Sequence, residues 1–327
     1  MSLAIHKKDL SSFLSDLLKD WPVFGPTEDK KAVTSKFRFG KISSFKDLSL
    51  NYGQTVLPPK KYILPSNETL FKFKNNKVSP PIDTEFIIFG LNRRDGEGIF
   101  YLDKVMAKPI NDDKYKERRY KIKTIIIDSL PPTNTINCDL YLQRVDKDHF
   151  LAFPFSEFGE AIIRKPYFGH EGNVGTLSTS HLQDETIYHP RLDKIVENSY
   201  ENPIWDRLAK TCLNCGICSY VCPLCYCFKI EDQIEITQNI KKDCQGCRSR
   251  TWDSCMLPDF AKVSFHNFRP EFKDRIYNWY YHKFVRMPRE YGFPGCIDCG
   301  RCITFCPANI NFREVLKELI KDEKHTK

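Results

Sequence analysis

The chain has 327 residues, which is long enough for two domains with separate hydrophobic cores. Its hydrophobic fraction of 41% and aromatic fraction of 13% are typical of a folded protein and exclude a disordered one. The net charge of +8 is modest for this length, and the basic segment "KYKERRYKIK" carries no recognised motif, so we expect a solvated basic surface and no nucleic-acid partner.

The first predicted element is an amphipathic helix near the N-terminus. Its apolar residues recur at helical spacing until Trp21-Pro22 ends the pattern, and they are Leu3, Leu10, Phe13, Leu14, Leu17 and Leu18. We expect this helix to pack on its own domain. The same segment lacks the features of a signal peptide, and no apolar run has the length of a membrane span. These observations predict a cytoplasmic protein without a membrane span.

Short strands are predicted next in the chain. They are "KYIL", "LFKFK", "EFIIFG", "YKIKTIIID", "CDLYLQRV", "HFLAFPF" and "EAIIRK". Several are rich in β-branched and aromatic residues and are bounded by turn-forming residues. Residues 1–195 are therefore predicted to form a mixed α+β domain, which would serve as a docking surface or scaffold.

The composition changes near residue 195 to helical patterns and cysteine-rich loops. The segment "FREVLKELIKDEK" places Phe312, Val315, Leu316, Leu319 and Ile320 on one helical face. Residues 196–327 are predicted to form a mainly α-helical, ferredoxin-like domain.

Cysteine spacing is the strongest signal in the sequence. Thirteen of the 14 cysteines lie between Cys212 and Cys306. Within this region the pattern C-x2-C-x2-C-x3-C-P occurs at Cys212 and again at Cys296. A reducing cytoplasm disfavours disulfides, so the pattern indicates metal ligation. Structural zinc usually takes four ligands as two separated pairs, which does not fit this repeat.

The repeated pattern is typical of two-cluster ferredoxins. In them, the first three cysteines of a pattern bind one [4Fe–4S] cluster and the fourth, before the proline, binds the other cluster. The predicted ligands are Cys212, Cys215, Cys218 and Cys306 for the first cluster, and Cys296, Cys299, Cys302 and Cys222 for the second.

Residues 223–295 separate the two patterns, a longer link than a compact ferredoxin uses. The link shows little strand patterning, which favours a helical domain. Lys210, Arg301 and backbone N–H groups are expected to offset the negative charge of the clusters. Gly216 and Gly300 each follow the second cysteine of a pattern, where a glycine allows the backbone to approach a cluster or to turn.

Five further cysteines lie in the same region. Cys225, Cys227, Cys244 and Cys247 could together form a third, four-thiolate site, because "CQGC" has the spacing of half a metal site. The favoured interpretation is that they and Cys255 are buried thiols packed against the cluster helices.

The sequence resembles a known family at these motifs. "CLNCGICSYVCPLCYCF", "RTWDSC", "HNFRP", "HKF" and "CIDCGRCITFCPANI" are similar to the β subunit of soluble [NiFe] hydrogenases, or sulfhydrogenases, and to the electron-donating subunit of anaerobic sulfite reductase. "TVLPPKKYILPSNETLFKF" and "FIIFGL" fit the same family. Cys225, Cys227 and Cys255 match cysteines of the family pattern, whereas Cys244 and Cys247 do not.

The chain also departs from the family pattern. Family members commonly carry cysteines after the "FG" strand and after the following strand, and these imply another cluster. Here Arg93 and Arg94 stand at the first place, and Cys138 alone stands near the second. One cysteine cannot hold a cluster, so no N-terminal cluster is expected.

The resemblance implies an electron-relay subunit of a cytoplasmic oxidoreductase complex. No catalytic residues are predicted on this chain. The implied partners are a diaphorase subunit that carries flavin and binds NAD(P)H, and the small and large subunits of a [NiFe] hydrogenase. A second hypothesis is the electron-donating subunit of an anaerobic sulfite reductase, which would work beside a siroheme subunit. Two further hypotheses are a nucleic-acid-binding iron–sulfur protein and a stand-alone dehydrogenase.

Overall fold

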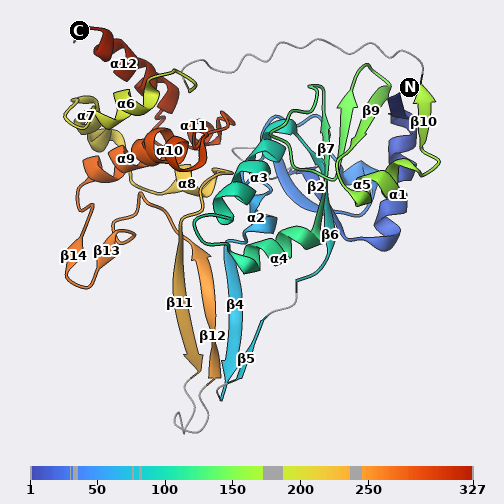
Figure 1. Ribbon diagram of the computed structural model, residues 1–327, viewed down its shortest axis with the longest axis horizontal. Helices are drawn as coiled ribbons and strands as arrows, with labels where there is room; N and C mark the ends of the chain where they lie inside the picture. Colours follow the sequence, from blue (N-terminus) through green and yellow to red (C-terminus); the bar gives the residue numbers. More distant parts are fainter. Residues whose placement is uncertain are drawn as a thin grey trace. The chain divides into compact units, whose positions relative to one another are not determined.

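A computed structural model describes residues 2–29, 31, 36–75, 77–80, 83–171, 187–235 and 245–325. The chain divides into two compact units (Figure 1). The first unit comprises Met1–Ile63 and Asp83–Leu182, and the second comprises Leu64–Ile82 and Gln183–Lys327. The sequence predicted a single boundary near residue 195. The structure differs because residues 64–82, in the middle of the expected N-terminal domain, belong to the second unit.

The first unit is built on an eight-stranded mixed sheet with the order β10-β1-β9-β8-β7-β6-β2-β3. Its strands are β1 (Ser2–His6), β2 (Val23–Glu28), β3 (Phe37–Ile42), β6 (Phe86–Leu91), β7 (Ile122–Asp128), β8 (Leu140–Arg144), β9 (His149–Pro154) and β10 (Phe168–Glu171). The pairs β2–β6, β6–β7 and β7–β8 are parallel, and the other pairs are antiparallel.

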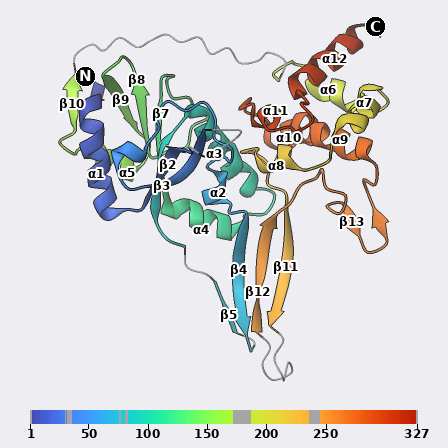
Figure 2. The same cartoon turned by 180° about the vertical axis from the view of Figure 1, so that it is seen from behind.

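Helices cover both faces of this sheet (Figures 1 and 2). Helices α1 (Leu10–Asp20) and α5 (Glu157–Ile163) lie on one face, and their apolar residues share a core with Ile125 and Ile127 of β7. Helix α3 (Arg93–Met106) lies on the other face, where Gly96 comes close to Ile126. Alternate residues of a strand point to opposite faces, so β7 is buried on both sides.

The predicted elements of the first unit need three corrections. "KYIL" forms the short helix α2 (Lys60–Ile63), and "EAIIRK" lies in α5 and not in a strand. Helix α5 begins after Ser156, whose side chain accepts a hydrogen bond from the Gly159 N–H and caps the helix. The N-terminal helix begins at Leu10, because Leu3 belongs to β1 and the 3-10 turn η1 (Lys7–Asp9) separates the two. Helix α4 (Asp113–Lys121) and the 3-10 turn η2 (Phe45–Asp47) complete this unit.

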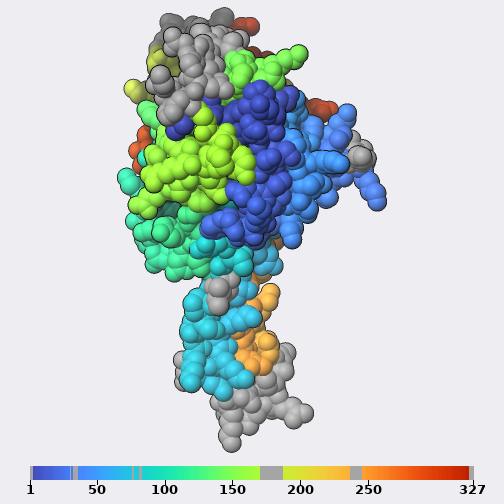
Figure 3. Space-filling view, turned by 90° about the vertical axis from the view of Figure 1, so that its right-hand side faces the viewer, coloured from blue at the N-terminus to red at the C-terminus, as the bar shows by residue number. Residues whose placement is uncertain are grey.

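The second unit contains a four-stranded antiparallel sheet with the order β11-β12-β4-β5. Its strands are β4 (Asn67–Lys74), β5 (Lys77–Ser79), β11 (Phe228–Glu235) and β12 (Gln245–Trp252). Figure 3 shows the light-blue surface of β4 and β5 against the orange surface of the cysteine-rich half of the chain. The predicted strand "LFKFK" therefore pairs within the second unit. This sheet adds strands to a region that was expected to be mainly helical.

Short helices form the remainder of the second unit. They are α6 (Leu192–Glu197), α7 (Ile204–Thr211), α8 (Ile217–Tyr220), α9 (Phe272–Tyr281), the π-helical turn η3 (His282–Arg286), α10 (Met287–Tyr291), α11 (Arg301–Thr304) and α12 (Phe312–His325), with the hairpin β13 (Lys262–Val263) and β14 (His266–Asn267). Their core contains Trp205, Trp279, Phe284 and Leu316. Within the described part of the chain, no helix combines the length and apolar character needed to cross a membrane.

Candidate metal centres

The two cysteine repeats have the same local backbone. Asn214 and Asp298, at matching positions, have φ angles of 48° and 54°. Gly216 and Gly300, two residues later, have φ angles of 78° and 74° and precede the short helices α8 and α11. These left-handed turns are accessible to glycine and, less readily, to Asn and Asp. The repeat in sequence is therefore a repeat in structure.

Backbone N–H groups point at cysteine sulfur atoms in both repeats. The donor-to-sulfur pairs are Asn214 N to Cys212 Sγ at 3.4 Å, Asp298 N to Cys296 Sγ at 3.3 Å, Leu224 N to Cys222 Sγ at 3.4 Å, and Ile310 N to Cys306 Sγ at 3.3 Å. Hydrogen bonds to a cysteine sulfur stabilise its thiolate form, which is the form that binds metal. Such bonds also influence the reduction potential of a bound cluster.

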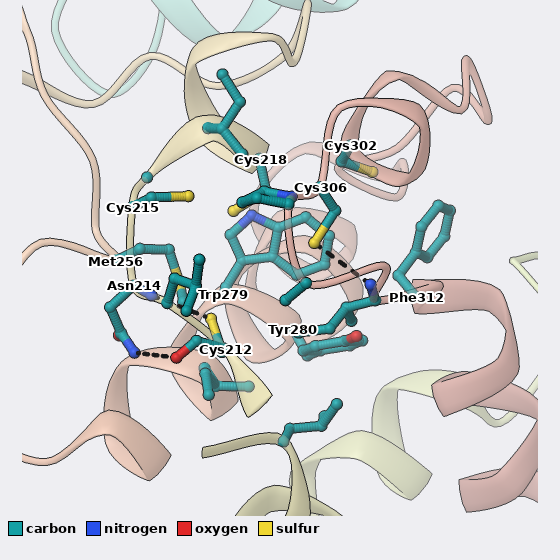
Figure 4. A pocket seen from close by; sticks show the side chains of 18 residues that line it. Cys212, Asn214, Cys215, Cys218, Met256, Trp279, Tyr280, Cys302, Cys306 and Phe312 are labelled. Carbon is teal, nitrogen blue, oxygen red and sulfur yellow. Dashed lines mark hydrogen bonds between the residues drawn. The ribbon is translucent and has the colours of Figure 1, made fainter. Parts of the chain in front are cut away.

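The first repeat lines a cavity that also receives a cysteine from the second repeat. Cys212, Cys215 and Cys218 line it, together with Cys306 from the loop after α11 and Cys302 from α11 itself. Figure 4 shows the side chains of Cys212, Cys215, Cys218 and Cys306 in this cavity, on different sides of Trp279. The fourth cysteine of the second repeat thus lies with the first three cysteines of the first repeat.

Cys222 has the reciprocal position. Burial raises the pKa of Cys302, and the nearby thiols of Cys296, Cys299 and Cys222 raise it further. The pKa of Cys296 is raised to about 12 by burial, with Cys299 and Cys222 adding to the shift. Lys283 Nζ lies 3.3 Å from Cys222 Sγ and donates to the carbonyl of Gly295, next to Cys296, at 2.8 Å, so the fourth cysteine of the first repeat lies near the second repeat.

The walls of the first cavity are mostly apolar. Met256, Ile276, Trp279, Tyr280 and Phe312 line it. In these surroundings burial raises the pKa of Cys212, and it raises the pKa of Cys218 to about 12. Without metal these buried thiols therefore hold their protons at neutral pH, and metal binding must release them.

The arrangement of the thiols favours a cluster over a single ion. Among the residues that the structure describes, no three His, Cys, Asp or Glu side chains are placed to hold one metal ion. A zinc ion requires its thiolates about 2.3 Å from a common centre. An iron–sulfur core is larger and keeps its ligands farther apart, so the thiol-only donor set around a cavity fits a cluster.

One buried lysine has no counterpart among the residues predicted from the sequence. Lys283, on η3, has a relative exposure of 4%, and its Nζ lies 3.3 Å from Cys222 Sγ. Burial acts to lower the pKa of Lys283, but Cys222, Cys225, Cys296 and Cys302 outweigh it and raise the pKa well above its ordinary value. The two cations that the sequence singled out differ, since Arg301 is buried and Lys210 is exposed.

Comparison with known proteins identifies the family. Residues 211–310 match the family described as a 4Fe-4S dicluster domain. The chain is 31% identical over 339 residues to sulfhydrogenase 2 subunit beta of Pyrococcus furiosus, and the match covers 96% of this chain and 97% of that protein. The chain belongs to the sulfhydrogenase β-subunit family. No solved structure matches it. Its cysteine-rich half is thus an iron–sulfur, electron-transfer domain.

The extra cysteines that the structure describes lie in different places. Cys225 is hydrogen-bonded to Cys222, and Cys227 to Cys255. Cys247 on β12 pairs with Gln233 on β11. Gln233 is five residues, or about 17 Å, along β11 from Phe228, the residue that follows Cys227. Cys244 lies outside the described residues. The site that would join Cys225, Cys227, Cys244 and Cys247 therefore stays a prediction, and the position of Cys247 on β12 does not favour it.

The N-terminal unit shows what stands in place of the cysteines expected from the family. Arg93 Nε forms a buried ion pair with Glu97 Oε1 at 3.1 Å, and the Arg93 N–H donates to Asp128 Oδ2 at 2.7 Å. Cys138 is buried, and burial raises its pKa. The ends of β6 and β7 thus carry a hydrogen-bonded ionic cluster, which offers no set of thiolates.

Proposed function

We propose that the chain is the electron-relay subunit of a cytoplasmic, multi-subunit hydrogenase and that it holds two [4Fe–4S] clusters by crossed ligation. The proposed ligands are Cys212, Cys215, Cys218 and Cys306 for the first cluster, and Cys296, Cys299, Cys302 and Cys222 for the second. The observation that supports the proposal is the exchange of the fourth cysteines, in which Cys306 lines the first cavity and Cys222 shares Lys283 Nζ with the carbonyl of Gly295, the residue before Cys296. When bound, each cluster accepts and returns one electron.

The residues of the chain have three tasks in this function. Backbone N–H groups orient the sulfur atoms, and apolar side chains such as Trp279 and Phe312 keep water from the ligands. The short helices α8 and α11 hold the two sites close together, because each repeat supplies ligands to both. We propose that these helices form the core of a ferredoxin-like domain and that the β11-β12-β4-β5 sheet is an addition to it.

The proposed partners follow from the relative's name and the family resemblance. The relative is a sulfhydrogenase subunit, which supports a complex with the small and large subunits of a [NiFe] hydrogenase. Flavin and NAD(P)H are assigned to a diaphorase subunit rather than to this chain. Purification from the native host through a tag on this chain tests this assignment. Nickel and flavin in the purified complex are expected; a siroheme subunit in their place would contradict the hydrogenase assignment.

Crossed ligation can be tested with pairs of cysteine variants. We expect the wild-type chain to hold about eight iron atoms, and Cys306→Ser to lose about four of them. Because Cys306 and Cys215 serve one cluster in this scheme, Cys215→Ser combined with Cys306→Ser should lose no more iron than either change alone. Cys306→Ser combined with Cys296→Ser should lose both clusters.

The matched control is Cys247→Ser, which should retain all the iron, because Cys247 lies on β12 and outside both quartets. Iron and acid-labile sulfide analysis of each variant provides the measurement. If Cys306→Ser with Cys296→Ser kept about four iron atoms, while Cys306→Ser with Cys215→Ser lost all eight, each repeat would hold its own cluster and the crossed scheme would be wrong.

A further inference from the structure

The buried ammonium group of Lys283 is enclosed by the second set of thiols. Its Nζ donates to Gly295 O at 2.8 Å and to Cys222 Sγ at 3.3 Å, and it lies 5.1 Å from the centroid of the Trp279 ring. Gly295 directly precedes Cys296, the first cysteine of the second repeat. The lysine therefore contacts one ligand sulfur and the backbone that leads to another.

Cys222 is the most strongly hydrogen-bonded ligand sulfur among the described residues for which such bonds are observed. It accepts from the Leu224 N–H and from Lys283 Nζ, and it also shares a hydrogen bond with the Cys225 thiol. By comparison, Cys212 accepts from the N–H of Asn214, and Cys306 from that of Ile310. The two proposed clusters thus differ in environment. Lys283 contacts a ligand sulfur of the second, whereas the buried Arg275 lies beside the ligand loop of the first, where its Nε donates to Asn214 Oδ1 at 3.3 Å.

The local helix geometry explains how a lysine reaches this position. Helix α9 passes into the π-helical turn η3 and then into α10, so the helix widens at Lys283. Single π-helical turns occur inside α-helices mostly at functional sites. Phe284 and Val285, which follow, are fully buried in the core, whereas Arg286 is largely exposed and pairs with Glu290. The widened turn presents one basic residue to the thiols and one to solvent.

We propose that Lys283 raises the reduction potential of the cluster held by Cys296, Cys299, Cys302 and Cys222, and that it raises the potential of the other cluster less. The inference rests on the proposed function. Reduction adds one negative charge to a cluster, and a nearby buried cation stabilises that charge more strongly than an exposed one does. Removing this charge would then make reduction of the second cluster less favourable.

The first test is a redox titration of the reconstituted full chain, followed by electron paramagnetic resonance. Lys283→Met keeps the length and apolar character of the stem but removes the charge. We expect the equilibrium constant for reduction of the second cluster to fall at least tenfold. For a one-electron couple this lowers the reduction potential by at least about 59 mV. The first cluster should shift less. Lys283→Arg, which keeps the charge, should remain nearer to the wild-type potential than Lys283→Met.

Arg286→Met is the matched control, because it removes the same charge from the same helical turn at a solvent-exposed position. It should leave both potentials unchanged. Equal shifts in Lys283→Met and Arg286→Met, or no shift in Lys283→Met, would overturn the inference.

A second measurement needs no variant and remains valid if Lys283→Met does not fold. The chain is labelled with [ε-¹⁵N]lysine, and the reduced protein is examined by electron spin echo envelope modulation. A ¹⁵N coupling to the second cluster is expected, because Lys283 contacts its ligand sulfur on Cys222. The absence of this coupling would contradict the placement of Lys283 beside that cluster. If the wild-type chain binds no cluster at all, the proposed function fails; if the clusters form but Lys283→Met leaves their potentials unchanged, only the present inference fails.

Discussion

At the scale of single residues, the π-helical turn places a second basic side chain, the partly buried His282, next to Lys283. Its Nε2 lies 3.2 Å from Tyr226 Oη. Burial lowers the pKa of His282 to about 4, and the charges of Lys283 and Arg286 add to this effect. The folded chain therefore holds His282 neutral at pH values where the unfolded chain, with the ordinary value of 6.5, protonates it.

This difference in pKa predicts a pH dependence of stability. Because the pKa is depressed in the folded state, the stabilisation is present above pH 6.5 and is lost as the pH falls towards 4. We expect the loss in the cluster-free chain to reach about 3 kcal/mol. Urea unfolding between pH 4 and pH 7 measures it, and His282→Gln should flatten that part of the curve. Identical curves for the two proteins would contradict the assignment.

Candidate ligands could be named from the sequence because cysteine spacing is a local property. The repeats at Cys212 and Cys296 each fold as a loop and a short helix, so their spacing alone indicates which sulfurs can gather. Lys283 could not be found in this way. Lysine is nearly always exposed, and its burial here depends on a π-helical turn and on thiols from two distant repeats.

At the scale of elements, the left-handed turns between the cysteines decide whether the ligand loops can form. Gly216 has a φ of 78°, and a Cβ there would lie 3.0 Å from the Cβ of Ser254 and 3.1 Å from a ring carbon of Tyr220. Gly292 has a similar φ of 79°, but a Cβ there would meet no atom within 4 Å. Comparing substitutions at these two glycines therefore separates the cost of a left-handed backbone from the cost of steric crowding.

Gly216→Ala is expected to be more harmful than Gly292→Ala. The left-handed conformation alone costs about 1–2 kcal/mol for an alanine, and the contacts with Ser254 and Tyr220 add to this cost only at Gly216. We expect Gly292→Ala to lower the melting temperature of the chain while retaining its iron, and Gly216→Ala to lose iron from the first cluster as well. Equal iron contents in the two variants would show that the ligand loop tolerates the crowding.

Element prediction from the sequence succeeded where a strand is buried as an apolar run and failed where a strand is exposed or a helix is short. The strands β6, β7 and β8 are nearly all buried and were found as apolar runs. By contrast, β11 is exposed along its whole length, so its burial gives no alternating signal. The sequence predicts strands at the short helices α2 and α5. Segments of four and seven residues are too short to distinguish the helical repeat of apolar residues from the alternation of a strand.

At the scale of the whole molecule, the second unit is completed by a strand from the first third of the chain. Glu68 on β4 and Arg250 on β12 are directly paired in the ladder, and Arg250 Nε donates to Glu68 Oε1 at 2.6 Å. Both side chains have relative exposures of 3%. Trp252 Nε1 also donates to Leu64 O at 2.9 Å. No local pattern could predict this pairing, because its partners are far apart in sequence.

The allocation of residues 64–82 to the second unit leads to a prediction about fragments. A fragment of residues 183–327 lacks β4, which leaves β12 as an unpaired edge and Arg250 without the carboxylate of Glu68. Removing one member of a buried ion pair lowers the free energy of unfolding by about 3–5 kcal/mol, because the other charge stays buried without its partner. An unpaired edge strand also promotes aggregation. We therefore expect this fragment to be poorly soluble after expression and to bind little iron on reconstitution.

Restoring the strand should restore the fragment. Residues 64–82 joined through a flexible Gly/Ser linker to residue 183 supply β4 and β5, so the joined fragment should be soluble and take up iron like the full chain. Glu68→Ala in the joined fragment is the control, and it should lower the free energy of unfolding by about 3–5 kcal/mol. Soluble, iron-replete protein from residues 183–327 alone would show that the cluster domain does not depend on β4. In that case the pairing of β4 with β12 would not be needed for solubility or for cluster binding.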